Sequence, residues 1–179
     1  FKKIPKKIKL INCVGGGSSA YGFWSEFIDY DKKQIELIGV EAGGPKSSKL
    51  HAAPLTNGAK LGILHGAAAY VCQNNEGQIN DTESISAGLD YPGVSPIHCF
   101  LKDTKRARYT SATDEDALKA YQLVTKLEKI RPSLEPCHAF AEAIKIAPKL
   151  SKDTIIICNS CGDSLKDKDI LKARLGKIK

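Results

Sequence analysis

Residues 10–30 read LINCVGGGSSAYGFWSEFIDY, and this stretch indicates the fold class. The apolar run at residues 10–14 is partly β-branched, which is typical of a buried strand, and apolar side chains then recur at helical spacing over residues 21–28. Three glycines and two serines separate the two patterns. The stretch therefore predicts a strand, a tight turn and a helix.

The turn has the composition of an anion site. Gly15, Gly16 and Gly17 have no Cβ, so their backbone N–H groups can approach an anion closely. Ser18 and Ser19 stand where a helix exposes its unpaired amides, and phosphate is the natural ligand there. The pattern is neither GxGxxG nor GxxxxGK[ST], because no lysine follows the last glycine. A glycine-rich turn without a ligand is the alternative.

Length and composition predict one globular domain over residues 1–179, since 42% of the side chains are hydrophobic. No apolar run approaches the ~20 residues of a membrane span, and no signal-peptide pattern opens the chain. We therefore expect a cytoplasmic protein without a membrane partner, with a plastid location left open. The chain begins at Phe1 and contains no methionine, which suggests a fragment of a longer protein.

The net charge of +7 is concentrated at the two ends of the chain. Five lysines lie in residues 1–9, and residues 166–179 contain six basic side chains against two acidic ones. Residues 1–8 and 170–179 are therefore interpreted as basic, solvated terminal segments. A nucleic-acid groove needs basic and aromatic side chains on the folded body, so no nucleic-acid partner is expected.

The six cysteines are interpreted as reduced thiols, most of them buried. Cys158 and Cys161 form the only CxxC pair. Without a second pair or a nearby histidine, that spacing is weak support for a zinc or redox site.

Strand and helix patterns alternate along the rest of the chain and predict an α/β domain. Three further strands are expected, at residues 34–41, 107–112 and 154–158, and the last of these, TIIIC, has the strongest buried-strand signal. Two helices are expected, at residues 113–128 with Thr113 as N-cap and at residues 134–146 with Ser133 as cap.

Two long segments, residues 42–66 and 86–96, are predicted to be irregular, and residues 67–79 are predicted to form a hairpin around Asn-Asn-Glu-Gly. CVGGGSS follows the first predicted strand and CNSCGD follows the last. Ligands of α/β sheets bind beyond the carboxyl ends of the strands, so a flat ligand can reach from one of these loops to the other.

Five segments, in order, resemble the carboxy-terminal half of the tryptophan synthase β subunit. They are CVGGGSSAYG at residues 13–22, KLHAAPLTNG at 49–58, ISAGLDYPGVSP at 85–96 followed by His98, TDEDAL at 113–118 and LEPCHA at 134–139. ISAGLDYPGV is the most specific, because GGGS also fits threonine synthase, cysteine synthase and threonine dehydratase. The resemblance implies a fold-type II pyridoxal phosphate enzyme, with a three-layer, mostly parallel sheet covered by helices on both faces.

The resemblance also implies roles for individual residues. The segment Gly15–Ser19 matches the phosphate-binding loop, with Ser19 where the family usually has asparagine. Glu135 matches a glutamate beside the cofactor ring. The alternative is that Glu135 only interacts favourably with the helix dipole, as an acidic residue in the first turn of a helix does. Asp90 matches an aspartate on the substrate side of the pocket and also suits an Asx-turn. His138 is interpreted as a structural histidine.

Further matches concern a cation, a channel and the last loop. Backbone carbonyls around Leu89, Tyr91 and Gly93 match a monovalent-cation site for Na⁺ or K⁺. Leu64 and His65 match the lining of the indole channel, with simple packing as the alternative. The family's serine that donates to the pyridine nitrogen falls on Cys161, or on Ser160 with a shift of one residue, in a loop that is longer here and lacks the family's arginine.

The implied reaction joins L-serine and indole into L-tryptophan with pyridoxal phosphate. The parent subunit is expected to form a β–β homodimer and to bind an α subunit. The Schiff-base lysine belongs to the half that this chain does not match, so the chain alone is expected to be inactive. Another fold-type II enzyme and a non-catalytic packing domain are the alternatives.

Overall fold

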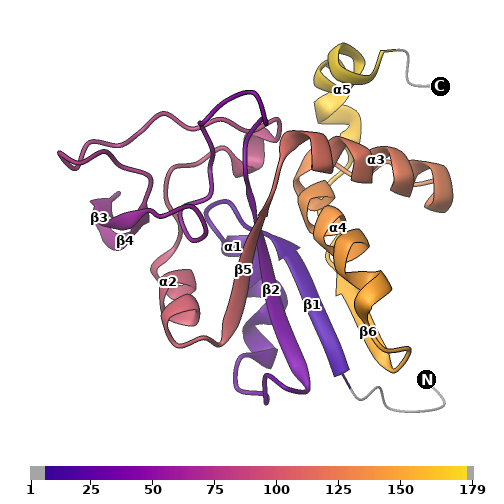
Figure 1. The fold of residues 1–179 in the computed structure, drawn as a ribbon, viewed down its shortest axis with the longest axis horizontal. Helices are drawn as coiled ribbons and strands as arrows, with labels where there is room; N and C mark the ends of the chain where they lie inside the picture. Colours follow the sequence, from indigo (N-terminus) through magenta and orange to yellow (C-terminus); the bar gives the residue numbers. More distant parts are fainter. Residues whose placement is uncertain (1–6, 177–179) are drawn as a thin grey trace.

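A computed structural model describes residues 7–176, and its centre is a four-stranded parallel sheet (Figure 1). The strand order is β5-β2-β1-β6, with bounds β1 Lys7–Cys13, β2 Ile35–Ala42, β5 Ala107–Ala112 and β6 Thr154–Cys158. All four strands were expected from the sequence. Because the strands are parallel, their carboxyl ends and the loops that follow lie at one edge of the sheet.

Helices cover both faces of this sheet, as expected for a three-layer fold. The bounds are α1 Ser18–Trp24, α2 Pro96–Asp103, α3 Asp114–Glu128, α4 Leu134–Ile146 and α5 Lys168–Leu175. Leu10 of β1 packs in one core cluster with Trp24 of α1 and with Leu101 of α2. The next residue, Ile11, packs on the opposite face with Ala139 of α4. This alternation is what a strand buried on both faces requires.

The two predicted helix starts are observed, but only one uses its side chain as expected. Thr113 forms a capping box with Asp116, whose backbone N–H donates to the Thr113 hydroxyl. Ser133 stands at the N-cap of α4 and makes no side-chain cap. Its hydroxyl instead donates to the carbonyl of Cys161 at 3.0 Å, which ties α4 to the loop after β6.

The predicted hairpin around Asn-Asn-Glu-Gly is observed only next to its turn, where the backbone N–H of Asn74 donates to the carbonyl of Gln78 at 2.9 Å. β4, Ala67–Val71, pairs antiparallel with β3, Lys60–Leu64, which lies inside the segment predicted to be irregular. Residues 73 and 79 form only an isolated bridge. The tight turn of the observed hairpin is His65-Gly66, with φ of 51° and 78°, values that suit a type I′ turn. A histidine in that position does not signal a turn in the sequence.

Three further differences concern the outer parts of the fold. β6 lies at the edge of the sheet, and Ile157 is 43% exposed, so this strand is less buried than its composition predicts. α2 was not expected. The predicted basic terminal segments are described only in part, because residues 1–6 and 177–179 lie outside the described residues. Lys7 belongs to β1. Residues 170–175 belong to α5, and Leu171 of this helix is buried.

No helix among the described residues is long and apolar enough to cross a membrane.

Candidate functional site

The candidate site lies where β1 ends, between the glycine loop and residues 86–95. Gly15 allows these two segments to touch, because a Cβ there would lie 2.7 Å from the carbonyl oxygen of Gly88. The backbone N–H of Ser95 donates to the carbonyl of Gly16 at 2.9 Å. The glycine loop and the most specific segment of the family resemblance therefore form one continuous surface.

His98 supports the glycine loop from beneath. Gly17 has a φ of 98°, and a Cβ on it would lie 2.2 Å from Cδ2 of His98. Nε2 of His98 lies 2.8 Å from the carbonyl oxygen of Gly17, and Nδ1 lies 2.8 Å from the hydroxyl of Tyr109. Burial lowers the pKa of His98, so the ring is neutral. Nε2 then donates to Gly17 and Tyr109 donates to Nδ1.

The amides of the loop are available to a ligand. Within residues 7–176, the backbone N–H groups of Gly15–Ser19 donate to no protein acceptor. The hydroxyl of Ser19 is held in place, since it accepts from Nδ2 of Asn12 at 3.2 Å and from Nδ2 of Asn159 at 3.3 Å. A run of unpaired amides before a helix start is the chemistry of an anion site.

A cavity of about 520 Å³ adjoins this loop. Its lining includes residues predicted for four different roles, namely Gly16, Leu64, His65, Asp90 and Tyr91. A Cβ on Gly16 would meet no atom within 4 Å, so the space in front of this residue is open. The structure thus brings the predicted phosphate loop, the predicted channel residues and the predicted substrate-side aspartate to one cavity.

The predicted channel residues are held by the loop of residues 89–93. Nδ1 of His65 lies 2.8 Å from the hydroxyl of Tyr91, and the two rings are stacked with centroids 5.8 Å apart. Leu64 packs against Gly93, where a Cβ would lie 2.6 Å from Cδ2 of Leu64. These contacts create an aromatic and aliphatic wall beside the exposed Asp90.

The predicted cation ligands lie within one loop. The carbonyl of Leu89 accepts a hydrogen bond from the backbone N–H of Tyr91 at 2.9 Å. Among the described residues, no group of three or more His, Cys, Asp or Glu side chains could hold a metal ion. A cation held by the carbonyls of Leu89, Tyr91 and Gly93 stays a prediction.

Glu135 lies at the start of α4, and its carboxylate reaches the residues around the cavity. Oε1 accepts from the backbone N–H of Gly88 at 3.0 Å and from Nζ of Lys166 at 2.8 Å. Oε2 is buried without a hydrogen-bond partner among the described residues. Burial raises the pKa of Glu135, but hydrogen bonds, foremost from Lys166, lower it by more, to about 2. The carboxylate is therefore ionised at neutral pH.

Lys166 was not identified from the sequence. It lies in a short 3-10 helix, Ser164–Asp167, that follows the loop after β6. Nζ of Lys166 also contacts Oδ1 of Asp167 at 2.7 Å, and Oδ2 of Asp167 accepts from the backbone N–H of Leu134. No local pattern could have predicted this arrangement, because Lys166 and Glu135 are 31 residues apart.

Of the two candidates in the last loop, Cys161 is the one that faces the glycine loop. Its Sγ lies 3.9 Å from Sγ of Cys13, and it packs in a cluster that includes Leu89. Hydrogen bonds with Cys13 and with Ser19 lower the pKa of Cys161 to about 6, against the effect of burial. Ser160 is exposed. The geometry favours Cys161 over Ser160, and a role for either residue at the cofactor stays a prediction.

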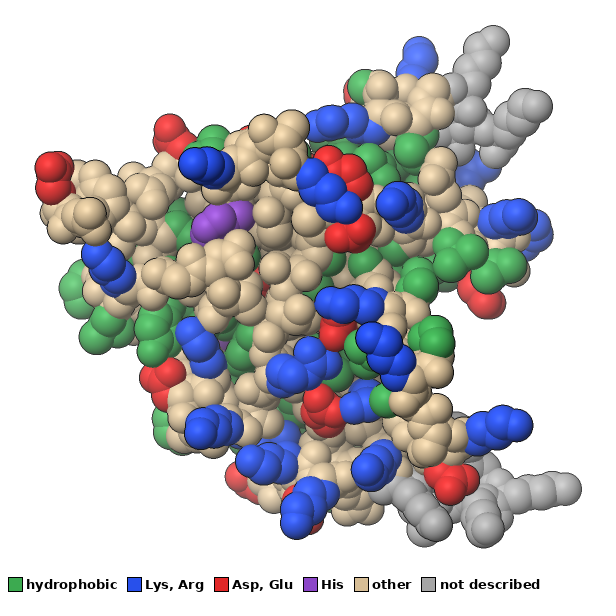
Figure 2. All heavy atoms as spheres, viewed as in Figure 1, with side chains coloured by type: hydrophobic (Ala, Val, Ile, Leu, Met, Phe, Trp, Pro, Cys, Tyr) green, Lys and Arg blue, Asp and Glu red, His purple; other side chains and the backbone are tan. Residues whose placement is uncertain are grey.

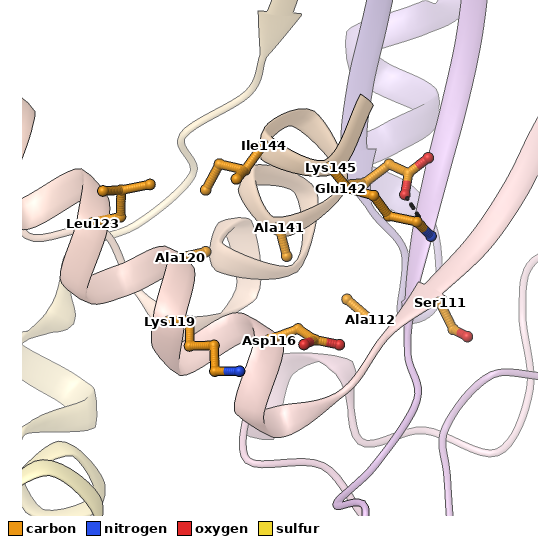
Figure 3. A pocket seen from close by; sticks show the side chains of 10 residues that line it. All are labelled: Ser111, Ala112, Asp116, Lys119, Ala120, Leu123, Ala141, Glu142, Ile144 and Lys145. Atoms are coloured by element: carbon orange, nitrogen blue, oxygen red, sulfur yellow. Dashed lines mark ion pairs between the residues drawn. The ribbon is translucent and has the colours of Figure 1, made fainter. Parts of the chain in front are cut away.

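The predicted structural histidine and a second hollow lie away from this cavity. His138 is buried, its Nδ1 lies 2.9 Å from the carbonyl of Leu134, and burial lowers its pKa, as suits a structural histidine. A groove of about 360 Å³ lies between α3 and α4 and contains an ion pair between Glu142 and Lys145 at 3.5 Å (Figure 3). None of the predicted site residues lines this groove.

Comparison with known proteins identifies the relatives of this chain. It is 48% identical over 159 residues to the tryptophan synthase beta chain of Chromobacterium violaceum, 47% over 169 residues to that of Afipia carboxidovorans and 49% over 170 residues to that of Allorhizobium ampelinum. The matches cover 88%, 92% and 94% of this chain. No protein-family model matches the chain.

The same matches cover only 39%, 41% and 40% of the relatives, so the chain spans about two fifths of their length. The matched region is the carboxy-terminal part of the relatives. The resemblance to this part of the tryptophan synthase β family, expected from the sequence, is thereby confirmed.

Proposed function

We propose that this chain is the cofactor-binding, carboxy-terminal part of a tryptophan synthase β subunit. We infer that the complete subunit condenses L-serine with indole to L-tryptophan with pyridoxal phosphate. The observation that carries the proposal is the run of unpaired amides at Gly15–Ser19 beside a cavity that contains Leu64, His65 and Asp90. Without the open space at Gly16, the amides would have no room for a ligand.

The residues present fit pyridoxal phosphate. The amides of Gly15–Ser19 would hold its phosphate, and the sulfur of Cys161 would face the ring nitrogen as a weak hydrogen-bond partner. Glu135, anionic and with a buried unpaired Oε2, would lie beside the ring. When bound, the cofactor supplies an electron sink for reactions at the amino-acid α and β carbons.

The chain's own residues would bind and orient the substrates. Leu64 and the stacked His65–Tyr91 pair form the wall along which we place indole, an aromatic ring that favours apolar and stacked contacts. Asp90, exposed at the cavity, would accept hydrogen bonds on the serine side. Na⁺ or K⁺ at the carbonyls of Leu89, Tyr91 and Gly93 would stiffen this loop.

We infer that the chain has no lysine able to form the Schiff base. Lys166 is the lysine nearest to Glu135 in the described structure, and two carboxylates hold its ammonium. These ion pairs raise the pKa of Lys166 despite its partial burial. A protonated amine is not a nucleophile, so the isolated chain would be inactive. The parent would act as a β–β homodimer with an α subunit.

The first test is a titration of the 179-residue chain with inorganic phosphate and with pyridoxal phosphate, followed by amide NMR. We expect the largest shifts at Gly15–Ser19, and unchanged amides there at millimolar ligand would contradict the proposal. Gly22, exposed on α1, serves as an internal reference.

The second test is turnover of serine and indole by the chain with and without the amino-terminal part of the subunit. Tryptophan should form only with both parts. Activity with a serine analogue and sulfide, or turnover of phosphohomoserine, would favour another enzyme of the same fold. Binding of the amino-terminal part without any turnover would favour a packing domain.

A further inference from the structure

Two thiols from opposite ends of the chain meet at the candidate site. Sγ of Cys13 lies 3.9 Å from Sγ of Cys161, although 148 residues separate them in the sequence. Cys13 is the last residue of β1 and is buried, two residues before the glycine loop. Cys161 lies in the loop after β6 and is partly exposed. One thiol is therefore accessible to a small reagent, and the other lies behind it.

The parallel pairing of β1 and β6 explains why these two cysteines meet. Ile11 is in register with Cys158, and the backbone N–H of Asn159 donates to the carbonyl of Ile11 at 3.2 Å. The chain after β6 therefore turns across the end of β1. Cys158, the other half of the CxxC pair, packs with Ile11 and Ala139 on the face covered by α4. Cys161 instead shares a cluster with Cys13 and Leu89.

We propose that Cys13 and Cys161 form a reversible disulfide that joins the end of β1 to the loop after β6. A disulfide requires the sulfurs to approach to about 2 Å, which is about 2 Å closer than they are in the reduced chain. Rotation of the two side chains supplies this movement, since the backbone carbonyl of Cys161 is held by the Ser133 hydroxyl at 3.0 Å.

The oxidant is a low-molecular-weight disulfide such as glutathione disulfide. The Cys161 thiolate attacks one sulfur of the reagent, whose S–S bond breaks and releases one glutathione thiolate. Cys13 then loses its proton and attacks Sγ of Cys161, which releases the second glutathione. The two protein thiols are oxidised by two electrons in total, and one glutathione disulfide is reduced to two thiols.

The disulfide would also change the candidate site, and this consequence rests on the proposed function. The bond removes the free sulfur of Cys161 as a hydrogen-bond partner for the ring nitrogen of the cofactor. It also draws Cys161 toward Cys13. We expect the oxidised chain to bind pyridoxal phosphate about fivefold more weakly, as suits the loss of one hydrogen bond.

Peptide mapping tests the disulfide directly. Trypsin places Cys13 in peptide 10–32 and both Cys158 and Cys161 in peptide 153–166. After treatment of the folded chain with glutathione disulfide and alkylation of the remaining thiols, the two peptides should be joined, and reduction should separate them. A disulfide between Cys158 and Cys161 would leave peptide 10–32 free, which would overturn the proposal.

Single variants identify the partners. Cys158→Ser should keep the link, whereas Cys13→Ser and Cys161→Ser should each abolish it. Cys137→Ser, which alters a buried thiol outside this cluster, is the matched control and should also keep it. Circular dichroism checks that each variant is folded. Should Cys13→Ser fail to fold, Cys161→Ser alone decides, and a link that persists in it would overturn the proposal.

A parallel measurement of pyridoxal phosphate binding separates this inference from the proposed function. Oxidation should weaken binding in the unaltered chain and in Cys158→Ser, but not in Cys161→Ser. A disulfide without cofactor binding in either redox state would support the disulfide and contradict the proposed function. Cofactor binding without any linked peptide would support the proposed function and contradict the disulfide.

Discussion

Nζ of Lys166 lies 2.8 Å from Oε1 of Glu135, so a lysine from the loop after β6 holds the carboxylate at the start of α4. Asp167 supports this pair, because it contacts Lys166 through one oxygen and accepts from the backbone N–H of Leu134 through the other. The contact links the segment after β6 to the glutamate that we place beside the cofactor ring. Among the interactions of Glu135, it contributes most to lowering the pKa of this carboxylate.

Replacement of Lys166 by methionine should raise the pKa of Glu135 from about 2 toward its ordinary value of 4.5, since the largest favourable contact of the carboxylate is lost. The depressed pKa stabilises the fold above pH 4.5, and this stabilisation is lost as the pH falls toward 2. The variant should therefore lose less stability over that range. NMR titration of the Glu135 carboxyl carbon and urea unfolding would measure both effects.

The control is Lys172→Met, which removes one exposed positive charge from α5. It should leave the Glu135 titration unchanged. Equal shifts in the two variants would show that general charge, and not the 2.8 Å contact, sets the pKa of Glu135.

The buried carboxylate of Glu41 predicts the opposite dependence of folding stability on pH. It is fully buried on β2, where its carboxylate accepts from the backbone N–H of Leu55 at 2.9 Å and from the Thr56 hydroxyl at 2.8 Å. Burial raises its pKa to about 7 despite these bonds. The folded state then holds a proton that the unfolded state releases above pH 4.5, so stability falls between pH 4.5 and 7, by at most about 3 kcal/mol.

Glu41→Gln should remove this loss, and urea unfolding at pH 5 and pH 8 would measure it. Burial lowers the pKa values of His98 and His138, so these histidines increase the stability of the fold as the pH rises toward 6.5. This contribution is the same in the unaltered chain and in Glu41→Gln. The difference in pH-dependent stability between the unaltered chain and the variant therefore measures the contribution of Glu41. The exposed Glu76→Gln is the control. An unchanged pH profile in Glu41→Gln would show that the carboxylate stays ionised in the fold.

The glycine loop allows stability and ligand binding to be separated. Gly17→Ala should destabilise the chain by about 3 kcal/mol, because φ is 98° and the new Cβ would lie 2.2 Å from the His98 ring. Gly16→Ala should change stability by less than about 0.5 kcal/mol, since its Cβ meets no atom within 4 Å. Its methyl group would nevertheless enter the cavity.

Phosphate titration of both variants completes this test. Gly16→Ala should bind phosphate at least about tenfold more weakly while it unfolds at the same urea concentration as the unaltered chain. Undiminished phosphate binding in Gly16→Ala would show that the anion contacts lie elsewhere in the loop.

The sequence was most informative where the signals were local. The strand at β1, the glycine turn and the start of α1 follow from side chains within a few residues of one another, and the structure has all three. The capping box at Thr113 is equally local and is observed. These features depend on propensity and on backbone hydrogen bonds, which neighbouring residues decide.

Features that lack a local signal, most of them contacts between distant residues, could not be predicted from the sequence. The hairpin turn at His65 requires a positive φ, and histidine is not a residue type that indicates such a turn in a sequence. The contacts of Lys166 with Glu135 and of His98 with Gly17 join residues 31 and 81 positions apart. Family resemblance predicted the residues of the candidate site, but only the fold could show that Cys161 of the last loop lies against Cys13.

The outer face of the β3–β4 hairpin predicts self-association. Leu61 is 70% exposed and Ile63 is 71% exposed, and both lie on the same side of β3, since alternate residues of a strand share a face. Figure 2 shows hydrophobic side chains gathered at this end of the molecule. Exposed apolar surface of this kind tends to find a partner, so we expect the chain to form dimers at micromolar concentrations.

Sedimentation velocity over a tenfold range of concentration would detect this association, and the double variant Leu61→Ser, Ile63→Ser should shift the population toward monomer. The matched control is Leu123→Ser, Leu127→Ser, which removes two exposed leucines from α3 and should leave the hairpin contact intact. A greater loss of association in the α3 variant would place the contact on the α3–α4 side of the sheet. A monomer at every concentration, in the unaltered chain as well, would show that the hairpin face needs no partner.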